Sequence, residues 1–290
     1  MKPYRIALSL LALTFMAGMA NAQSTIAPRS LDLTFGKSFW GSMLPGYDLG
    51  PDDGDAFTDD QDSLGAYWEL AAIRRVLNTR TSFEARSFFG YSWANQSATE
   101  NVNIINPIGG GTTALSGGAA KLNSDTTHYG FDLAILDTWR TDFGGLSAGL
   151  AFSYMAFDQD FDARYAGAGL FEQELDQDFI GGKGILGWEG CLFDRPTSVR
   201  ASFGYYNLDA DYGYEGLQLA GVENLSLADH TATVEVRATR WYQMGDWYTG
   251  WTLGGMYIED FAQIDTVAGT GATLVTDDAA TAMAMVEILL

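Results

Sequence analysis

The sequence predicts an all-β protein: a closed, antiparallel, up-and-down β-barrel of about ten strands that spans a membrane. Three observations predict this fold class. Apolar and polar side chains alternate with a period of two in many segments, as expected for strands with one apolar and one polar face. Short turns and long connections alternate strictly between these segments. Acidic residues gather in the long connections, whereas arginines gather beside the short turns.

Ten segments carry the strand pattern, although strand boundaries predicted from sequence are uncertain by about two to four residues. In chain order they are 31–40, 63–74, 80–93, 127–139, 144–157, 178–191, 197–208, 230–242, 247–258 and 279–290.

The connections between these segments indicate a membrane barrel. Short ones lie near 75–79, 140–143, 192–196 and 243–246, and long ones near 41–62, 94–126, 158–177, 209–229 and 259–278. Because consecutive strands are antiparallel, all short turns fall at one end and all long loops at the other. Membrane barrels have this asymmetry, whereas a soluble Greek-key sandwich has no reason to sort its loops in this way.

The first 22 residues are expected to be a cleaved signal peptide. Lys2 and Arg5 precede the apolar run "IALSLLALTFMAGM", and Ala20-Asn21-Ala22 supplies the small residues that a signal peptidase recognises. We expect cleavage after Ala22, which makes residues 23–290 a single exported barrel domain. No later segment approaches the 18 or so consecutive apolar residues of a membrane-spanning helix.

The amino-acid composition limits the classes of molecule that the protein can bind and the ways in which its fold can be held together. The formal net charge is −21, so nucleic acid would be repelled and cations are the expected counterpart. The single cysteine, Cys191, cannot form an internal disulfide framework. The fold must therefore be held by packing and by closure of the sheet.

The segment 230–242 shows which strand face meets the membrane. One face carries Ala232, Val234, Val236 and Ala238, and the other carries Glu235 and Arg237. An arginine on the lipid face at mid-depth would cost about 2–4 kcal/mol. The charged face should therefore line the barrel interior.

Four further segments repeat this pattern. Their expected lipid faces hold Phe83, Ala85, Phe89, Tyr91 and Trp93; Phe131, Leu133, Ile135 and Trp139; Leu146, Ala148, Leu150, Phe152 and Tyr154; and Val199, Ala201, Phe203 and Tyr205. In the last segment, Ala284, Val286, Ile288 and Leu290 alternate up to the chain end, where this strand should close the barrel against the first. The residues predicted to line the lumen are Glu69, Glu84, Arg86, Asp132, Lys183, Arg200, Glu235, Arg237 and Glu287.

Tryptophans lie at the ends of the apolar faces, as the interfacial girdles of membrane barrels require. They are Trp68, Trp93, Trp139, Trp188, Trp241 and Trp247. By this architecture the chain resembles the small, porin-like outer-membrane β-barrels of bacteria. The resemblance covers residues 31–290 and implies insertion into outer-membrane lipid by the outer-membrane assembly machinery. Leu290 stands where that family usually ends on an aromatic residue.

The connection 94–126 leaves the strand number open. Its stretch "NVNIINPIGGGTTALSGGAAKLN" is rich in glycine and nearly uncharged. A hairpin inside the membrane would raise the barrel to twelve strands. Otherwise the segment forms a hairpin extension outside the membrane, or it folds back over the mouth of the barrel or into the lumen and narrows it.

Acidic connections are the candidate cation sites. Residues 48–62 contain seven carboxylates, and Asp52, Asp53 and Asp55 surround Gly54, although the full spacing of an EF-hand is absent. The connection 158–177 is of the same kind. The expected acidic mouth consists of Asp52, Asp53, Asp55, Asp59, Asp60, Asp158, Asp160 and Asp162. We expect no cofactor and assign no metal site, with Ca²⁺ at the acidic loops as the alternative.

An enzyme is not expected. Ten-stranded barrels include the omptins, surface proteases with an Asp-His pair, and Asp229-His230 invites that comparison. Adjacent strand residues point to opposite faces, however, so this pair cannot face one cleft unless the strand is bulged. His128 is expected at the outer end of its strand with no nucleophile beside it, and Cys191 is expected to be a small buried residue near a turn.

The predicted function is a porin-like channel for ions or small solutes with a bias toward cations. The alternatives are a non-conducting surface barrel for adhesion or envelope structure, and an omptin-like protease. The non-conducting surface barrel gains weight because eight strands already enclose only enough room for side chains, whereas open channels have about sixteen or more.

Overall fold

The computed structural model describes residues 31–44, 61–76, 79–98, 102–115, 118–216, 222–244, 247–267 and 269–289. The expected signal peptide lies outside these residues. No helix among them is long and apolar enough to cross a membrane. The strands are β1 (Leu31–Leu44), β2 (Gln61–Arg75), β3 (Thr81–Ala98), β4 (Val102–Ile105), β5 (Thr112–Leu115), β6 (Ala120–Thr141), β7 (Gly144–Tyr165), β8 (Ala168–Leu192), β9 (Arg195–Gly216), β10 (Val222–Met244), β11 (Trp247–Val267) and β12 (Gly271–Leu289).

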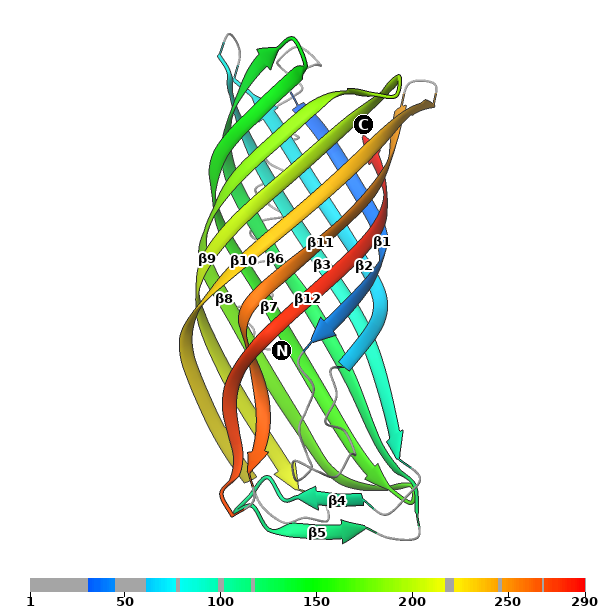
Figure 1. Cartoon of the computed structure of the whole chain (residues 1–290), viewed down its shortest axis with the longest axis vertical. Helices are drawn as coiled ribbons and strands as arrows, with labels where there is room; N and C mark the ends of the chain where they lie inside the picture. Colours follow the sequence, from blue (N-terminus) through cyan, green and yellow to red (C-terminus); the bar gives the residue numbers. More distant parts are fainter. Residues whose placement is uncertain are drawn as a thin grey trace.

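Ten of these strands form a closed antiparallel barrel, as predicted (Figure 1). The ring order is β1-β12-β11-β10-β9-β8-β7-β6-β3-β2. Closure occurs because β1 pairs with both β2 and β12, for example through Phe39, which faces Ala66 on one side and Ala284 on the other. We call the end with the β2–β3, β6–β7, β8–β9 and β10–β11 connections the short-turn end, and the opposite end the extended end.

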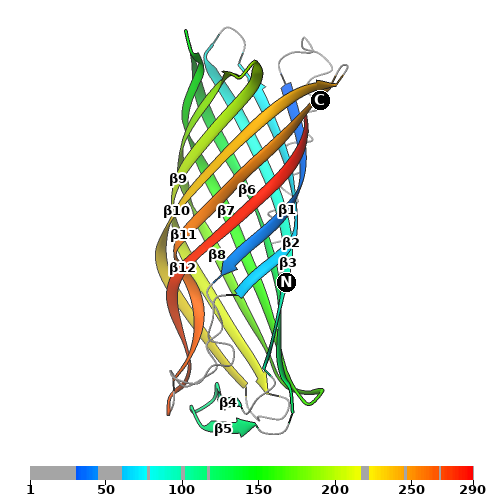
Figure 2. The ribbon, with the colours of Figure 1, turned by 45° about the vertical axis from the view of Figure 1, so that its right-hand side comes forward.

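The hairpin of β4 and β5 forms a separate two-stranded sheet, so the alternative of twelve barrel strands is wrong. It lies across the extended end of the barrel (Figures 1 and 2). The backbone N–H of Ala272 donates to the carbonyl of Pro107, and that of Gly269 to the carbonyl of Gly110. Ile104 is buried in the same apolar cluster as the barrel interior. The segment therefore folds back over the mouth.

The prediction of long loops was wrong at three connections. β7 runs to Tyr165 and β8 starts at Ala168, so the expected loop 158–177 is almost entirely strand. Strands likewise replace most of the expected loops 209–229 and 259–278. The alternation continues there: Phe157 and Phe161 of β7 point inward, and Asp160 and Asp162 lie on the outer face between and beyond them. Charged residues in these segments predicted loops, but outside a membrane charged residues are equally compatible with the outer face of a strand.

The strands are consequently much longer than a membrane requires. The 25 residues of β8 rise about 60 Å along the barrel axis, using about 3.3 Å per residue and a tilt of about 40°. Only an apolar band of about 25 Å is needed to cross the bilayer. The barrel thus continues well beyond the band at the extended end, except at β1 and β2, which end earlier (Figure 2).

Most apolar faces point outward and the charged faces inward, but Phe131 and Tyr154, which were predicted to face lipid, are buried in a small cluster with Tyr129 and Ala156. Val234 and Val236 are exposed, whereas Glu235 and Arg237 of the same strand are 7% and 9% exposed. Trp93, Trp139 and Trp251 are also exposed on the outside. Trp241 does not belong to a girdle, because its register with Gly250 puts it on the inner face with Thr239. The side chain of Trp247 lies outside the described residues.

The interior has two layers. A polar layer lies at the level of the apolar outer band. Toward the extended end, a layer of large apolar side chains fills the barrel, among them Trp40, Phe157, Phe179 and Phe261, all fully buried. A β-bulge between Ile258 and Phe261, with Asp260 at φ 53°, turns Phe261 into this layer against Phe157. Membrane barrels usually have polar interiors, so the apolar layer was not predicted.

Candidate functional site: a buried ion-pair network across the barrel

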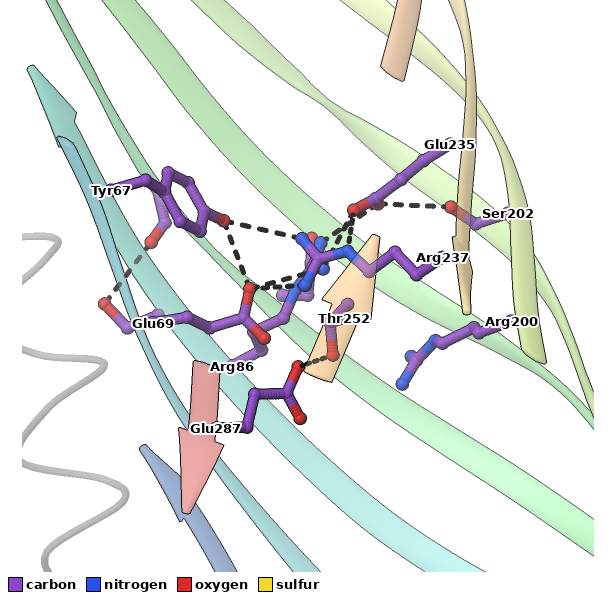
Figure 3. A network of polar contacts seen from close by, with 12 residues as sticks. Tyr67, Glu69, Arg86, Arg200, Ser202, Glu235, Arg237, Thr252 and Glu287 are labelled. Carbon is purple, nitrogen blue, oxygen red and sulfur yellow. Dashed lines mark hydrogen bonds and ion pairs between the residues drawn. The ribbon is translucent and has the colours of Figure 1, made fainter. Parts of the chain in front are cut away.

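Arg86 of β3 is the centre of the polar layer (Figure 3). Its Nη2 lies 2.5 Å from the Asp132 carboxylate, and its Nε donates to the same group at 2.7 Å. Its Nη1 and Nη2 donate to the two oxygens of Glu235 at 3.1 and 3.2 Å. Glu69 lies 3.8 Å from Nη1. One guanidinium therefore holds three carboxylates from three other strands.

Arg237 of β10 links two of the same carboxylates from the other side. Its Nε lies 2.5 Å from Glu235 and its Nη1 lies 2.6 Å from Glu69. The hydroxyl of Tyr67 donates to Glu69 at 3.1 Å. Glu69 and Glu235 are thus shared between two arginines, which fixes both guanidinium planes.

Lys183 of β8 completes the network. Its Nζ lies 2.9 Å from Asp132 and 3.8 Å from Glu235. The Ser153 hydroxyl donates to Asp132 at 2.6 Å, and the Tyr206 hydroxyl donates to Ser153 at 3.2 Å. The oxygens of Asp132 are therefore satisfied by an arginine, a lysine and a hydroxyl.

The network bridges the full width of the barrel. Going round the ring from β10 through β9, β8, β7 and β6 to β3 takes five steps of ten, so β3 and β10 are opposite one another. The ion pair between Arg86 and Glu235 joins these two strands. Arg237 and Glu69 join β10 to β2 in the same way. Both pairs cross the space that a channel would need.

Charge balance explains how so many ionised groups tolerate burial. Glu69, Asp132 and Glu235 carry three negative charges, and Arg86, Lys183 and Arg237 carry three positive ones. Each is contacted by at least one group of opposite charge. Removing one member of a buried pair strands its partner and typically costs about 3–5 kcal/mol. The network is therefore a rigid unit whose members depend on one another.

The other predicted lumen residues lie around this network. Arg200 Nη1 contacts Glu84 at 2.6 Å, and the Arg200 side chain is partly open to solvent. Glu287 accepts a hydrogen bond from Thr252 at 2.6 Å. Sequence reasoning did not single out Tyr67, Ser153 or Tyr206, although each shares the inner-face spacing of a charged residue on its own strand or on the next one.

The apolar layer adjoins the network directly. The Arg86 guanidinium lies over the Phe88 ring at 5.5 Å, and Phe88 contacts His128 at 5.0 Å between centroids. His128 stacks on Phe157 at 4.1 Å. Neither ring nitrogen of His128 has a hydrogen-bond partner among the described residues. His128 had been expected at the outer end of a strand, but β6 extends past it to Ala120 and places it in the interior.

The other sequence candidates do not form a site. Asp52, Asp53, Asp55, Asp59 and Asp60 lie outside the described residues. Asp158, Asp160 and Asp162 lie on β7 rather than in a loop, on the face opposite to Phe157. Within the described ranges, no group of three or more potential ligand residues is arranged to hold a metal ion. Cys191 is exposed at the short-turn end rather than buried, because its strand ends one residue later.

The Asp229-His230 pair is divided between the two faces of β10. His230 stacks on the exposed Tyr205 at 5.7 Å, on the outer side. Asp229 shares the inner-face spacing with Thr231 and accepts a hydrogen bond from the backbone of His230. These two side chains therefore do not form a catalytic dyad.

Comparisons with known proteins agree with the fold. No family model matches the sequence, and no curated protein matches it. Among solved structures, the outer-membrane protease OmpT from Escherichia coli is similar with a TM-score of 0.57 at 12% identity, covering 91% of this chain and 97% of that one. The translocator domain of the autotransporter NalP from Neisseria meningitidis matches with a TM-score of 0.49 at 14% identity, over 97% and 96% of the two chains. A FadL homologue from Pseudomonas aeruginosa gives 0.36 at 11% identity, over 90% of each chain.

At these identities the likeness concerns the fold alone. The apolar outer band, the charged interior, the closed ring of ten antiparallel strands and the similarity to OmpT together show that this chain has the fold of an outer-membrane β-barrel.

Proposed function

We propose that the protein is a closed outer-membrane barrel that passes no ions in this conformation and carries its extended end at the cell surface, in adhesion or in envelope structure. The observation that carries the proposal is the Arg86–Glu235 ion pair between opposite strands. An ion crossing the barrel would have to displace this pair. Doing so leaves charges buried without partners, at a cost of about 3–5 kcal/mol each.

A second obstruction supports the same proposal. Phe157, Phe179 and Phe261 pack against one another with ring centroids 5.1–6.0 Å apart. This cluster fills the barrel between the network and the extended end. The β4–β5 hairpin then covers the mouth. Ten strands enclose little more room than the eight that side chains alone can fill.

The cation-biased channel is the competing proposal. It is supported by the acidic residues toward the extended end, since a mouth of one charge sign concentrates counter-ions. It requires both interior layers to move. An omptin-like protease has less support, because Asp229 and His230 lie on opposite faces.

The test is ion flux across vesicles that contain the purified full-length protein, with an ion-sensitive dye inside. We expect flux equal to that of empty vesicles. Loss of heat-modifiable gel migration would reveal unfolded protein and so controls for insertion. As a positive control, an open porin reconstituted in the same vesicles should admit ions. A steady cation current through the wild type would overturn the closed-barrel proposal in favour of the channel.

A further inference from the structure

Two arginines lie side by side on the outer wall near the short-turn end. Arg240 of β10 faces Thr197 of β9 in the register. Arg195 is two residues before Thr197 and therefore shares its face. The two arginines are diagonal neighbours, a relation that brings side chains on adjacent strands to about 7–8 Å. Val199, Val236 and Phe203 on this face are exposed, so the face is the outer one.

Neither arginine has a carboxylate partner in the part of the chain that the structure describes. The Arg195 guanidinium lies over the Tyr242 ring at 5.4 Å. Arg240 Nη2 donates only to the backbone carbonyl of Phe193, at 3.4 Å, and its Nε is buried with no hydrogen-bond partner. Asp194 lies in the adjoining turn but forms no ion pair with either arginine. In a chain of net charge −21, two adjacent arginines without acidic partners require an explanation.

The position of the two arginines along the barrel axis supplies an explanation. Ten residues separate Arg240 from His230 at the far limit of the apolar band on β10, about 33 Å of strand, or about 25 Å along the axis at a tilt of about 40°. Arg240 thus marks the edge of a bilayer-sized band. Trp251, which pairs with Arg240, is 63% exposed, and Phe193 in the turn is 80% exposed. Exposed aromatic residues of this kind sit at the level of lipid headgroups.

We propose that Arg195 and Arg240 form a binding site for the phosphate of an anionic phospholipid in the leaflet at the short-turn end. Guanidinium groups donate paired hydrogen bonds that match phosphate oxygens. Arg195 is exposed, and Nη1 of Arg240 has no hydrogen-bond partner among the described residues, so both guanidinium groups keep donors for a phosphate. The acyl chains would lie along Val199, Val236 and Leu253, and Trp251 and Phe193 would flank the glycerol region. The inference rests on the proposed membrane location but not on the closed lumen.

The test is retention of lipid by the full-length protein in native mass spectrometry from a mild detergent. The probes are phosphatidylglycerol and diacylglycerol with the same acyl chains, which separate recognition of phosphate from recognition of chains. We expect the wild type to retain phosphatidylglycerol and not diacylglycerol. The Arg195→Gln/Arg240→Gln variant should bind phosphatidylglycerol about tenfold more weakly. The matched control is Arg80→Gln/Arg140→Gln, which removes the same charge at the same end and should behave as wild type.

Two further measurements distinguish a lipid site from a site for free phosphate and allow for a variant that does not fold. Inorganic phosphate in large excess should not displace the lipid, whereas displacement would indicate a site for free phosphate instead. If the glutamine variant does not fold, Arg195→Lys/Arg240→Lys keeps the charge but loses the forked geometry, and should show intermediate retention. Equal retention in wild type and variant, or equal loss in the control variant, would overturn the proposal. Ion flux through the wild type would contradict the closed barrel and leave this site unaffected.

Discussion

Replacing Arg86 by methionine tests whether the network is a single coupled unit. Methionine fills a similar volume but removes every contact with Asp132, Glu235 and Glu69. The remaining members then carry three negative charges against two positive ones, in a setting where the Arg86 side chain was only 7% exposed. Stranding a buried charge in this way should lower the free energy of unfolding by about 3–5 kcal/mol.

A second substitution should recover part of that loss. Glu235→Gln alone leaves an excess positive charge and should be costly for the same reason. In the Arg86→Met/Glu235→Gln double variant the network is neutral again. The double variant should therefore lose clearly less than the sum of the two single losses, with a coupling energy in the range of about 0.5–3 kcal/mol seen for contacting residues.

Urea unfolding of the protein in lipid vesicles, followed by tryptophan fluorescence, measures these free energies. Arg164→Met is the control, because Arg164 and Asp162 form an exposed pair with side-chain exposures of 53% and 29%. Exposed pairs contribute about 0–1 kcal/mol. The reasoning fails if Arg86→Met costs no more than Arg164→Met, or if the losses at Arg86 and Glu235 simply add.

Three other predictions concern the wall of the barrel. Val236→Arg should cost about 2–4 kcal/mol of stability in vesicles, because it puts a charge in the middle of the lipid face; a tolerated substitution would place that face elsewhere. An impermeant thiol reagent should label Cys191, which is exposed at the short-turn end, only after the outer membrane is permeabilised, and labelling of intact cells would reverse the orientation. Burial and the carboxylates of Asp125 and Asp176 raise the pKa of Asp160, so ionised Asp160 destabilises the fold and the free energy of unfolding should rise as the pH falls through that pKa. The Asp160→Asn variant should be more stable than the wild type by about 0.2–1 kcal/mol at neutral pH. It should gain nothing below the usual aspartate pKa of about 3.9, and urea titrations at both pH values would measure the difference.

The face of most strand residues could be predicted because it follows from local alternation, whereas the choice between ten and twelve strands depended on the β4–β5 hairpin. Glu235 and Arg237 were assigned to the interior on the cost of placing charge in lipid, and they are buried there. A period of two needs no knowledge of other strands. The strand ends could not be predicted, because beyond the membrane a strand that carries charged outward residues such as Asp160 and Asp162 has the composition of a loop.

The side-chain contacts inside the barrel could not be predicted from the sequence. Arg86 and Glu235 are 149 residues apart, and only the closed ring makes their strands opposite one another. The same holds for His128, whose contact with Trp40, 5.5 Å between ring centroids, forms only because closure places β1 three strands from β6 in the ring, with both side chains inside.

The alternation of apolar and polar residues by itself determined that the chain is a membrane-type barrel of about ten strands with charged residues inside. Only the tertiary structure decided that these charges form a closed network beneath an apolar layer and a covering hairpin. The physical reason is that each outward residue must suit only the lipid or water that it contacts, whereas each interior residue must suit the side chains that contact it from other strands of the ring. That depends on register, tilt and closure, which no single strand encodes.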